Sequence, residues 1–421
     1  MPQNNDSSHV VFFSGSVHLR MGGPSGYLAN LIEGMHQIEE GSSASFIRFA
    51  AGKKTESQIK PKRKYFSEIK KSSFVKAIKS YLAIRKEFSR FESFLNNSLS
   101  SNLERILEIT SQTKTIHVHT APDACLLFNT LKKLQRQDIK IMFTPHTPES
   151  LACEVTQKLK DTYPNLSDSK LQQLFNVVLE VENKALSVAD ILVFPSKEAM
   201  EPLAQTNPNF ESLIENKDIR YFATGTTALE TKLTSREARK KYGVEDKFAV
   251  CFIGRHNEVK GYDLLVKVAE VLNTSHPDIH FLVAGKNDSN FEISHLSNWI
   301  ELGYVQPGDV LKASDCFVLP NRRTFYDLVL LEALSIGLPI VASATGGNIS
   351  VSKTVETLSL FDISNDPVKE LADAIVGVYE QSPCLREKIG TRNRECFEQY
   401  FTNQKFAERY VSLIEEIHSV L

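Results

Sequence analysis

Short apolar runs alternate with longer stretches of helical periodicity along most of the chain. Residues 9–13 form an apolar run typical of a buried strand, a glycine-rich turn follows at 22–26, and apolar residues then recur at helical spacing over 27–35. This order predicts a strand–loop–helix unit. Further strands are predicted at residues 115–118, 139–143 and 191–194, with helical patterns between them, as in a wound parallel sheet.

The same alternation begins again in the second half of the chain. Apolar runs at 248–253 and 280–284 end at Gly254 and Gly285, and a helical pattern lies between them. Two successive sets of strand–helix alternation predict an α/β protein with two Rossmann-like, doubly wound domains. Further strands of the second set are predicted at residues 300–305, 316–319 and 339–342.

Length and composition agree with two ordinary globular domains. The chain has 421 residues, 42% of them hydrophobic and 24% charged, and these values exclude disorder for most of it. The expected domains span residues 1–220 and 221–396, about 200 residues each. The formal net charge is −2, with 49 basic and 51 acidic side chains. Because a dedicated nucleic-acid binder usually has a strong basic excess, no nucleic-acid partner is predicted.

Neither a membrane span nor secretion is predicted. The most apolar long stretch, residues 328–344, contains Glu332 and Pro339, which favours a buried core over a span. The N-terminus is polar and lacks the charged start and apolar run of a signal peptide. The six cysteines are scattered without metal-ligand or redox spacing. These features favour a cytoplasmic protein whose thiols are packed as small hydrophobes.

One segment departs from the average charge. Residues 53–90 hold thirteen Lys or Arg against three Glu. The second part of this segment has the pattern of a basic amphipathic helix. Such a helix suits peripheral contact with an anionic membrane at its inner face, or contact with an acidic acceptor. It equally suits a solvated face above a packed apolar stripe. The stripe consists of Phe74, Ile78, Tyr81, Leu82, Phe88, Phe91 and Leu95.

Two cations lie where a predicted strand ends and a helix begins, in the segment 254–261 (GRHNEVKG). In a wound sheet ligands bind outside the carboxyl ends of the strands, so Arg255 and Lys260 are expected to point into that crevice. A planar guanidinium and a compact ammonium together suit a diphosphate, and the glycines let the backbone approach it. An isolated Arg/Lys pair at a helix start also forms structural salt bridges.

A second segment strengthens the phosphate interpretation. A predicted strand ends at Pro320, a polar loop follows, and a helix begins near Leu328 with Glu332 one turn inside it. A helix N-terminus offers unpaired N–H groups and a positive dipole end, which together bind phosphate. A carboxylate among Leu, Val and Ala is costly to bury without a partner, and ribose hydroxyls are a natural partner.

Together these two segments resemble the retaining glycosyltransferases of family 4. The resemblance runs through most of the chain, is strongest over residues 221–350, and implies the GT-B architecture, in which two Rossmann-like domains face each other across a cleft. Arg255 and Lys260 match the loop that binds the diphosphate of a nucleotide sugar. Glu332 matches the second Glu of a Glu–x7–Glu motif, which binds the ribose. The other implied donor-binding residues of this half are Gly254, Gly285, Tyr304, Val305, Leu328 and Val329.

The N-terminal half resembles the family more loosely. Gly22 and Gly23 resemble the glycine loop after the first strand, which lies beside the donor phosphates and the acceptor. His146, in the sequence TPHT, resembles the histidine that reaches the donor sugar near the transfer site, so the resemblance gives it a catalytic role with Arg255 and Lys260. His119 also ends a strand and is a weaker candidate. The stretch 397–421 resembles the C-terminal helix that packs back on the first domain.

One part of the motif departs from the family. The first Glu of Glu–x7–Glu, which contacts the donor sugar, is replaced by Thr324, and a glycine near the helix start is replaced by Asp327. The shorter, neutral Thr324 puts the donor sugar or its pose in doubt. Asp327 either repels a diphosphate or turns outward as an N-cap. Arg322 and Arg323 either contact donor or acceptor or form a solvated pair.

The resemblance implies a retaining transferase that moves a hexose-type sugar from a nucleotide-diphosphate sugar, foremost a UDP-sugar. The acceptor is a glycan, a lipid-linked sugar or a protein glycan. No metal or other cofactor is implied, and the oligomeric state is not predicted. The alternatives are a non-catalytic partner or binding subunit of the same fold and a sugar-nucleotide epimerase. A nicotinamide-dependent oxidoreductase is disfavoured because the first loop lacks G-x-G-x-x-G.

Overall fold

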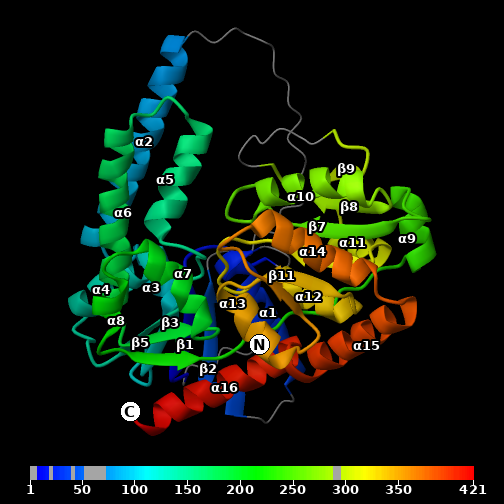
Figure 1. The fold of residues 1–421 in the computed structure, drawn as a ribbon. Helices are drawn as coiled ribbons and strands as arrows, with labels where there is room; N and C mark the ends of the chain where they lie inside the picture. Colours follow the sequence, from blue (N-terminus) through cyan, green and yellow to red (C-terminus); the bar gives the residue numbers. More distant parts are fainter. Residues whose placement is uncertain (1–6, 19–21, 39–42, 52–72, 288–294) are drawn as a thin grey trace.

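The computed structural model describes residues 7–18, 22–38, 43–51, 73–287 and 295–421. It contains two six-stranded sheets whose paired strands all run parallel (Figure 1). We refer to the part of the chain that carries the first sheet as the first half and to the part that carries the second sheet as the second half. Within the described residues, no helix is long and apolar enough to cross a membrane.

The first sheet has the strand order β2-β1-β3-β4-β5-β6. Its strands β1, β3 and β5 are buried over their whole length because both faces of the sheet are covered there. In β1, Val10 and Phe12 pack into one apolar cluster, whereas Val11 and Phe13 pack into another on the opposite face. The strands are β1 (His9–Phe13), β2 (Ile47–Ala51), β3 (Thr115–Val118), β4 (Lys140–Phe143), β5 (Ile191–Phe194) and β6 (Asp218–Tyr221).

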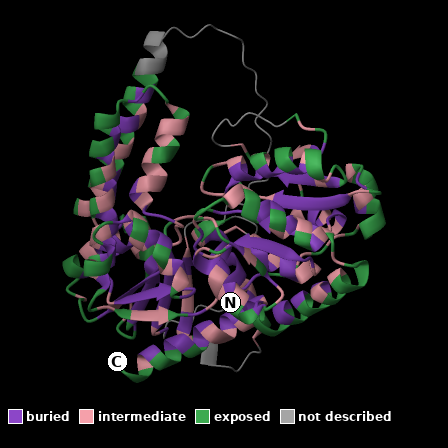
Figure 2. Cartoon of the chain, viewed as in Figure 1, coloured by how far each residue is buried: buried purple, intermediate pink, exposed green. Residues whose placement is uncertain are grey.

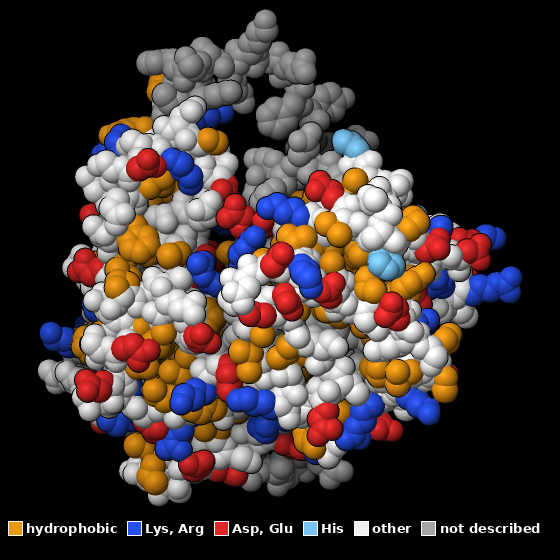
Figure 3. Space-filling view, viewed as in Figure 1, with side chains coloured by type: hydrophobic (Ala, Val, Ile, Leu, Met, Phe, Trp, Pro, Cys, Tyr) orange, Lys and Arg blue, Asp and Glu red, His pale blue; other side chains and the backbone are white. Residues whose placement is uncertain are grey.

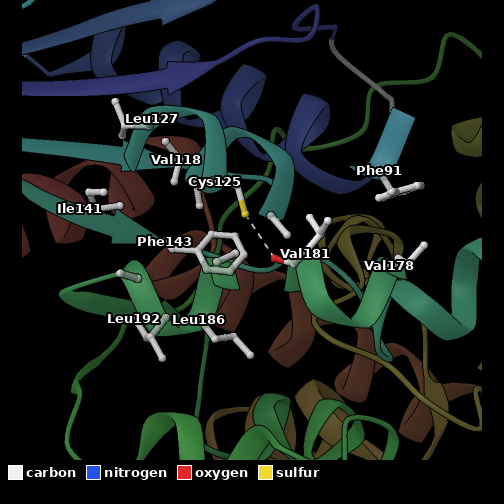
Figure 4. Close-up of a cluster of buried hydrophobic side chains, with 14 of the residues drawn as sticks. Phe91, Val118, Cys125, Leu127, Ile141, Phe143, Val178, Val181, Leu186 and Leu192 are labelled. Atoms are coloured by element: carbon white, nitrogen blue, oxygen red, sulfur yellow. Dashed lines mark hydrogen bonds between the residues drawn. The ribbon is translucent and has the colours of Figure 1, made fainter. Parts of the chain in front are cut away.

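Helices of the first half cover its sheet and extend beyond it. Three of them, α2, α5 and α6, stand together as an arm that rises from the sheet (Figure 1). Figure 4 shows the cluster at the base of this arm, where Cys125 Sγ donates to the carbonyl oxygen of Val181 at 3.4 Å. The helices are α1 (Gly23–Gln37), α2 (Ser73–Asn96), α3 (Ser101–Leu107), α4 (Ala121–Lys133), α5 (Leu151–Thr162), α6 (Asp168–Val188), α7 (Glu201–Thr206) and α8 (Phe210–Ile214), with 3-10 turns at Ser43–Phe46 and Glu198–Met200.

The second sheet has the strand order β12-β11-β10-β7-β8-β9. Its four inner strands lie between helices and are largely buried, whereas the outer faces of those helices are exposed (Figure 2). The strands are β7 (Phe248–Ile253), β8 (Ile279–Ala284), β9 (Trp299–Gly303), β10 (Cys316–Leu319), β11 (Ile340–Ser343) and β12 (Ser359–Phe361). The helices are α9 (Ser235–Tyr242), α10 (Tyr262–Ser275), α11 (Pro307–Ala313), α12 (Leu328–Ile336), α13 (Gly346–Thr354) and α14 (Pro367–Tyr379).

The C-terminal stretch is two helices and not one. In α15 (Pro383–Tyr400), Phe397 packs with the second sheet, and the helix ends just before Phe401. The last helix, α16 (Asn403–Ser419), packs against α1, and its Phe406 and Tyr410 belong to a cluster of the first half. The part of the chain that returns to the first half therefore begins after residue 402, later than the predicted 397.

The predicted α/β fold with two wound sheets is confirmed. Strands that were missed from the sequence are short or lie at sheet edges: β2, β6 and β12. In β6, Asp218 and Tyr221 are exposed, so this edge strand has no continuous apolar run. The predicted burial of the cysteines holds for four of the six, whereas Cys153 is half-buried and Cys384 is exposed.

Candidate active site

The loops that follow β7 and β10 meet at the point where the strand order of the second sheet reverses. In wound sheets this switch point is where ligands bind. Gly261, which ends the first loop, has φ +69°, and a Cβ on it would lie 1.9 Å from the carbonyl oxygen of Pro320 in the second loop. A side chain at position 261 would therefore force the loops apart. The two predicted donor segments are neighbours in the fold because of this contact.

Lys260 is the centre of the interactions between these loops. Its Nζ lies 2.5 Å from Oδ1 of Asp327, and the two side chains are only 17% and 18% exposed. The second carboxylate oxygen of Asp327 accepts a hydrogen bond from Thr324 Oγ1 at 2.7 Å and another from the side chain of Asn321. The backbone N–H of Lys260 donates to Asn257 Oδ1 at 2.9 Å. Lys260 is thus held as half of a buried ion pair.

The predicted outward, N-capping orientation of Asp327 is wrong. Asp327 occupies the N-cap position of α12, but its side chain makes no capping bond and turns inward to Lys260. Burial alone would raise the pKa of this carboxyl group, but the charge of Lys260 and the hydrogen bonds from Lys260, Thr324 and Asn321 outweigh it and lower the pKa. Asp327 is therefore ionised at neutral pH. Instead of facing a diphosphate as a bare negative charge, it neutralises the predicted phosphate-binding lysine.

The first turn of α12 begins beside Lys260 and has no side-chain cap. Leu328 and Val329 are its first two residues, both half-buried, and their backbone N–H groups belong to the four that no intrahelical carbonyl can satisfy. Glu332 follows one turn later and is half-buried between Leu331 and Ala333, which are fully buried. The anion-binding geometry expected from the sequence, a helix N-terminus beside Lys260, is therefore present.

The other cations of the site are also paired, in two cases with carboxylates from the first half. Arg323 donates to Glu149 at 2.6 Å, and Arg255 lies 4.0 Å from Glu154 of α5 with half of its side chain exposed. Arg322 forms a two-pronged ion pair with Asp263, at 2.6 and 2.7 Å. Arg322 and Arg323 are thus each ion-paired with a carboxylate while 41% and 40% of their side chains stay exposed. Figure 3 shows the result, with basic and acidic side chains interleaved over the middle of this face.

His146 lies where the two halves meet. It follows β4, its ring packs edge-on against Tyr27 of α1 with centroids 4.6 Å apart, and it is half-buried. The ring of Phe325, from the loop after β10, is 5.9 Å from it. Phe325 itself is buried in the apolar cluster of the first half. The Thr324–Asp327 loop therefore reaches the predicted catalytic histidine and the predicted phosphate site at once.

Part of the second half matches a known protein family. Residues 247–381 match the family model described as glycosyl transferases group 1. The chain is similar to the group 1 glycosyltransferases. A D-inositol 3-phosphate glycosyltransferase of Pseudarthrobacter chlorophenolicus is 29% identical over 217 residues, which are 48% of this chain and 50% of that protein. The chain spans about half the length of the curated relatives it matches.

Solved structures show that the likeness in fold extends over both halves. Sucrose-phosphate synthase of Thermosynechococcus elongatus superposes with a TM-score of 0.60 at 17% identity, covering 99% of this chain and all of that one. Anabaena Alr3699/HepE, solved in complex with UDP and glucose, superposes with a TM-score of 0.57 at 14% identity, covering 97% and 99% of the two chains. The predicted resemblance to glycosyltransferases with two wound domains is confirmed.

Glycines of the glycosyltransferase motifs have two different roles in this chain. Gly285, with φ +146°, packs so closely on Gly254 that a Cβ would lie 1.7 Å from the Gly254 carbonyl oxygen, so this pair holds two loop ends together. Gly22 is the N-cap of α1, and Gly23, with φ +67°, is its first residue. Among the described residues, a Cβ at either position would meet nothing within 4 Å. These two glycines therefore do not mark a close approach to another described segment.

The predicted base-contacting segment lies at the carboxyl end of β9. Tyr304 is 85% exposed and Val305 is half-buried. His256 was missed as a site residue. Its buried ring stacks on Tyr262 with centroids 4.3 Å apart and lies 3.4 Å from Glu301. Its position between Arg255 and Lys260 in the sequence was the signal that could have identified it.

A buried chain of histidines and hydroxyls was also missed. Tyr410 Oη lies between His9 Nε2, at 2.7 Å, and His117 Nδ1, at 2.9 Å, and His117 Nε2 contacts Thr144 Oγ1 at 2.9 Å. Beside it, His119 Nδ1 lies 3.0 Å from His146 Nε2. Burial lowers the pKa of His117 and His146 to about 3, and that of His9 well below its usual range. These rings are therefore neutral at physiological pH. The spacing His117-x-His119, which in extended backbone puts both rings on the same side of the chain, was the available signal.

Proposed function

We propose that the protein transfers a hexose-type sugar from a nucleotide-diphosphate sugar, a UDP-sugar, to a hydroxyl group of a glycan, lipid-linked or protein-glycan acceptor. The observation that carries the proposal is the meeting of Lys260 with the uncapped N-terminus of α12 at the switch point of the second sheet. The UDP complex of a protein with the same fold supports the choice of nucleotide. Domain boundaries at residues 220 and 396, with a cytoplasmic location, remain part of this proposal.

In the proposed retaining transfer, positively charged groups stabilise the departing phosphate, and no nucleophile from the protein is needed. The bond between C1 of the sugar and the β-phosphate oxygen breaks, and its electron pair remains on the phosphate. The acceptor oxygen forms a bond to C1 on the same face, and its proton passes to the departing phosphate oxygen. Lys260, Arg255 and the start of α12 would stabilise the charge that develops there. No metal cofactor is part of this proposal.

Donor binding at Lys260 must compete with the ion pair that Lys260 forms with Asp327. A diphosphate can use Lys260 fully only by taking the place of the Asp327 carboxylate at Nζ or by sharing it, because an ammonium group has three donors. Thr324 and Asn321 already satisfy the other oxygen of Asp327, so the carboxylate keeps partners when Lys260 turns to phosphate. Donor binding therefore exchanges one anion for another at Lys260, and does not fill an empty cationic pocket.

A panel of UDP-, GDP- and ADP-sugars, assayed by release of nucleoside diphosphate, tests the proposal directly. We expect release from one donor class, at a slow rate through hydrolysis and faster with a suitable acceptor. Absence of release from every donor would favour the second candidate, a non-catalytic binding subunit of the same fold. The Lys260–Asp327 ion pair and Thr324 are the observations in favour of that candidate, because together they neutralise or remove two groups that the resemblance assigns to donor chemistry.

Replacing Glu332 by alanine is expected to weaken UDP binding about 10-fold, since hydrogen bonds from ribose hydroxyls to a carboxylate contribute about 1.5 kcal/mol or more. Isothermal titration calorimetry with UDP measures this loss. The matched control is Glu270→Ala on α10, which removes the same charge from an exposed helix position and should leave the affinity unchanged. Equal affinities for Glu332→Ala and wild type would contradict the ribose assignment.

Peripheral contact with an anionic membrane through α2 belongs to the same proposal. Residues 53–72 of the predicted basic segment lie outside the described residues. In the described part, the apolar stripe divides: Phe91 is buried in the core, whereas Ile78, Tyr81 and Leu82 are 43%, 48% and 55% exposed. Lys79, Arg85 and Lys86 are exposed beside them. An exposed apolar strip beside exposed basic residues at the end of an arm suits the headgroup region of anionic lipid.

Binding to vesicles tests this contact. We expect the protein to co-sediment with phosphatidylglycerol vesicles at low salt but not with phosphatidylcholine vesicles. The double variant Ile78→Ser/Leu82→Ser is expected to bind at least about 5-fold less, because each substitution removes an exposed apolar side chain that would enter the lipid. Val271→Ser is the matched control, since Val271 is 49% exposed on α10 of the other half. If both variants bind as the wild type does, α2 has no role in membrane contact.

A further inference from the structure

Two histidines from neighbouring strand ends share one hydrogen bond at the meeting point of the two halves. His119 follows β3 and His146 follows β4, and the parallel pairing of Val118 with Phe143 brings their rings to the same edge of the sheet. His119 Nδ1 and His146 Nε2 are 3.0 Å apart. Nε2 of His146 is thereby used within the protein, so Nδ1 is the ring nitrogen left for a bound substrate.

A bond between two neutral imidazoles contains one proton. Burial lowers the pKa of His146 to about 3, and burial together with the neighbouring histidines lowers that of His119 well below its usual range. Each ring therefore carries a single N–H at neutral pH, and one nitrogen of the pair donates while the other accepts. The direction of this bond decides whether His146 Nδ1 is a donor or an acceptor toward a substrate. If His146 Nε2 accepts, the single proton of the ring must be on Nδ1; if Nε2 donates, Nδ1 is unprotonated.

The surroundings of His119 decide the direction of this bond. Its ring is 1% exposed, and no hydrogen-bond partner reaches its Nε2 within the part of the chain that the structure describes. If His119 carried its proton on Nε2, a buried N–H would have no acceptor, which is rare in folded proteins. If the proton is on Nδ1, it is donated to His146, and only a lone pair on Nε2 stays unused. The second arrangement is the less costly one.

We infer that His119 is a positioning residue that fixes His146 in the form protonated at Nδ1, so that His146 presents a hydrogen-bond donor, and not a base, to the bound substrate. The inference deepens the proposed function, on which its catalytic consequence rests. The rings of Tyr27 and Phe325, 4.6 and 5.9 Å from that of His146, limit its rotation. A fixed N–H can donate a hydrogen bond to an oxygen of the donor sugar or of the departing phosphate. His146 then cannot accept the proton of the acceptor hydroxyl, so the phosphate oxygen accepts it.

Nitrogen-15 NMR of the full chain, labelled at its eleven histidines, tests the inference without reference to turnover. The signal of His146, assigned by its loss in His146→Gln, is expected to show a protonated Nδ1 and an unprotonated Nε2. In His119→Phe, which keeps a ring but no donor, that pattern should change, and in His119→Gln, whose amide can donate again, it should return. A His146 protonated at Nε2 in the wild type overturns the inference, as does an unchanged His146 signal in His119→Phe.

His117→Phe is the matched control. His117 is a buried neighbour whose ring centroid is 4.2 Å from that of His119, but its bonds go to Thr144 and Tyr410. It should lose stability and leave the His146 signal unchanged. With an active donor, His119→Phe should lower kcat about 10-fold with a smaller change in KM, the range found when a partner that orients a site histidine is removed. If no donor is turned over, the proposed function fails while the NMR result still decides the role of His119.

Discussion

Replacing Lys260 by alanine is expected to lower release of nucleoside diphosphate at least about 100-fold and to lower the free energy of unfolding by about 3 kcal/mol. The first effect follows because Lys260 is the buried cation at the proposed phosphate site. The second follows because Asp327 stays buried after its cation is removed. Donor turnover and urea unfolding of the same variant measure the two effects.

The double variant Lys260→Ala/Asp327→Ala separates catalysis from stability. It removes both charges of the pair, so no uncompensated charge stays buried, and most of the lost stability should return. Turnover should stay as low as in the single variant, because the phosphate still lacks its lysine. Wild-type turnover in the double variant would show that Lys260 serves only to hold Asp327, and the assignment of the donor site would then be wrong.

Acid is expected to destabilise the protein well above the pH at which carboxylates titrate. His9, His117, His119 and His146 all have a lowered pKa in the folded protein, mainly because of burial, against about 6.5 when unfolded. Below pH 6.5 the unfolded chain binds more protons, so the free energy of unfolding falls as the pH falls. For a histidine whose folded pKa is about 3, the loss between pH 7 and pH 5 is about 2 kcal/mol.

Urea unfolding followed by circular dichroism at pH 7, 6 and 5 measures this effect. The buried carboxyl groups of Asp123, Glu149 and Glu182 act in the opposite direction, because burial raises their pKa and they gain protons in the folded state first. We expect the histidines to dominate because four of them act together. His117→Asn should show a pH slope that is smaller by about one proton. A stability that is constant or rises between pH 7 and pH 5 would contradict the prediction.

The strands that could be predicted from the sequence share one physical property. Central strands of a covered parallel sheet are buried on both faces, so β5, β7 and β10 are uninterrupted apolar runs in the sequence. Edge strands are buried on fewer sides and need no such run, which is why β2, β6 and β12 were missed. The apolar stripe of α2 looks uniform in the sequence, although Phe91 is buried in the core and Ile78 and Leu82 are exposed.

Some features of the candidate site could likewise be predicted from the sequence, and others could not. Strand ends followed by Gly, Arg and Lys or by His mark where a wound sheet can hold a ligand, and local order alone places 254–261, 320–327 and His146 at such ends. Their partners could not be predicted. Lys260 pairs with a residue 67 positions away, Arg323 with one 174 away, and the chain of buried histidines closes only through Tyr410 of the last helix.

The sequence by itself determined the two wound sheets, the strand ends that bear the candidate site and the resemblance to glycosyltransferases, because each depends on residues close together in the chain. The tertiary structure alone decided that Asp327 neutralises Lys260, that Phe325 reaches His146 from the other half, and that His119 holds His146. The physical reason is that burial, pairing of charges and the direction of a shared proton depend on which side chains the fold brings within a few ångströms, and no local pattern contains that information.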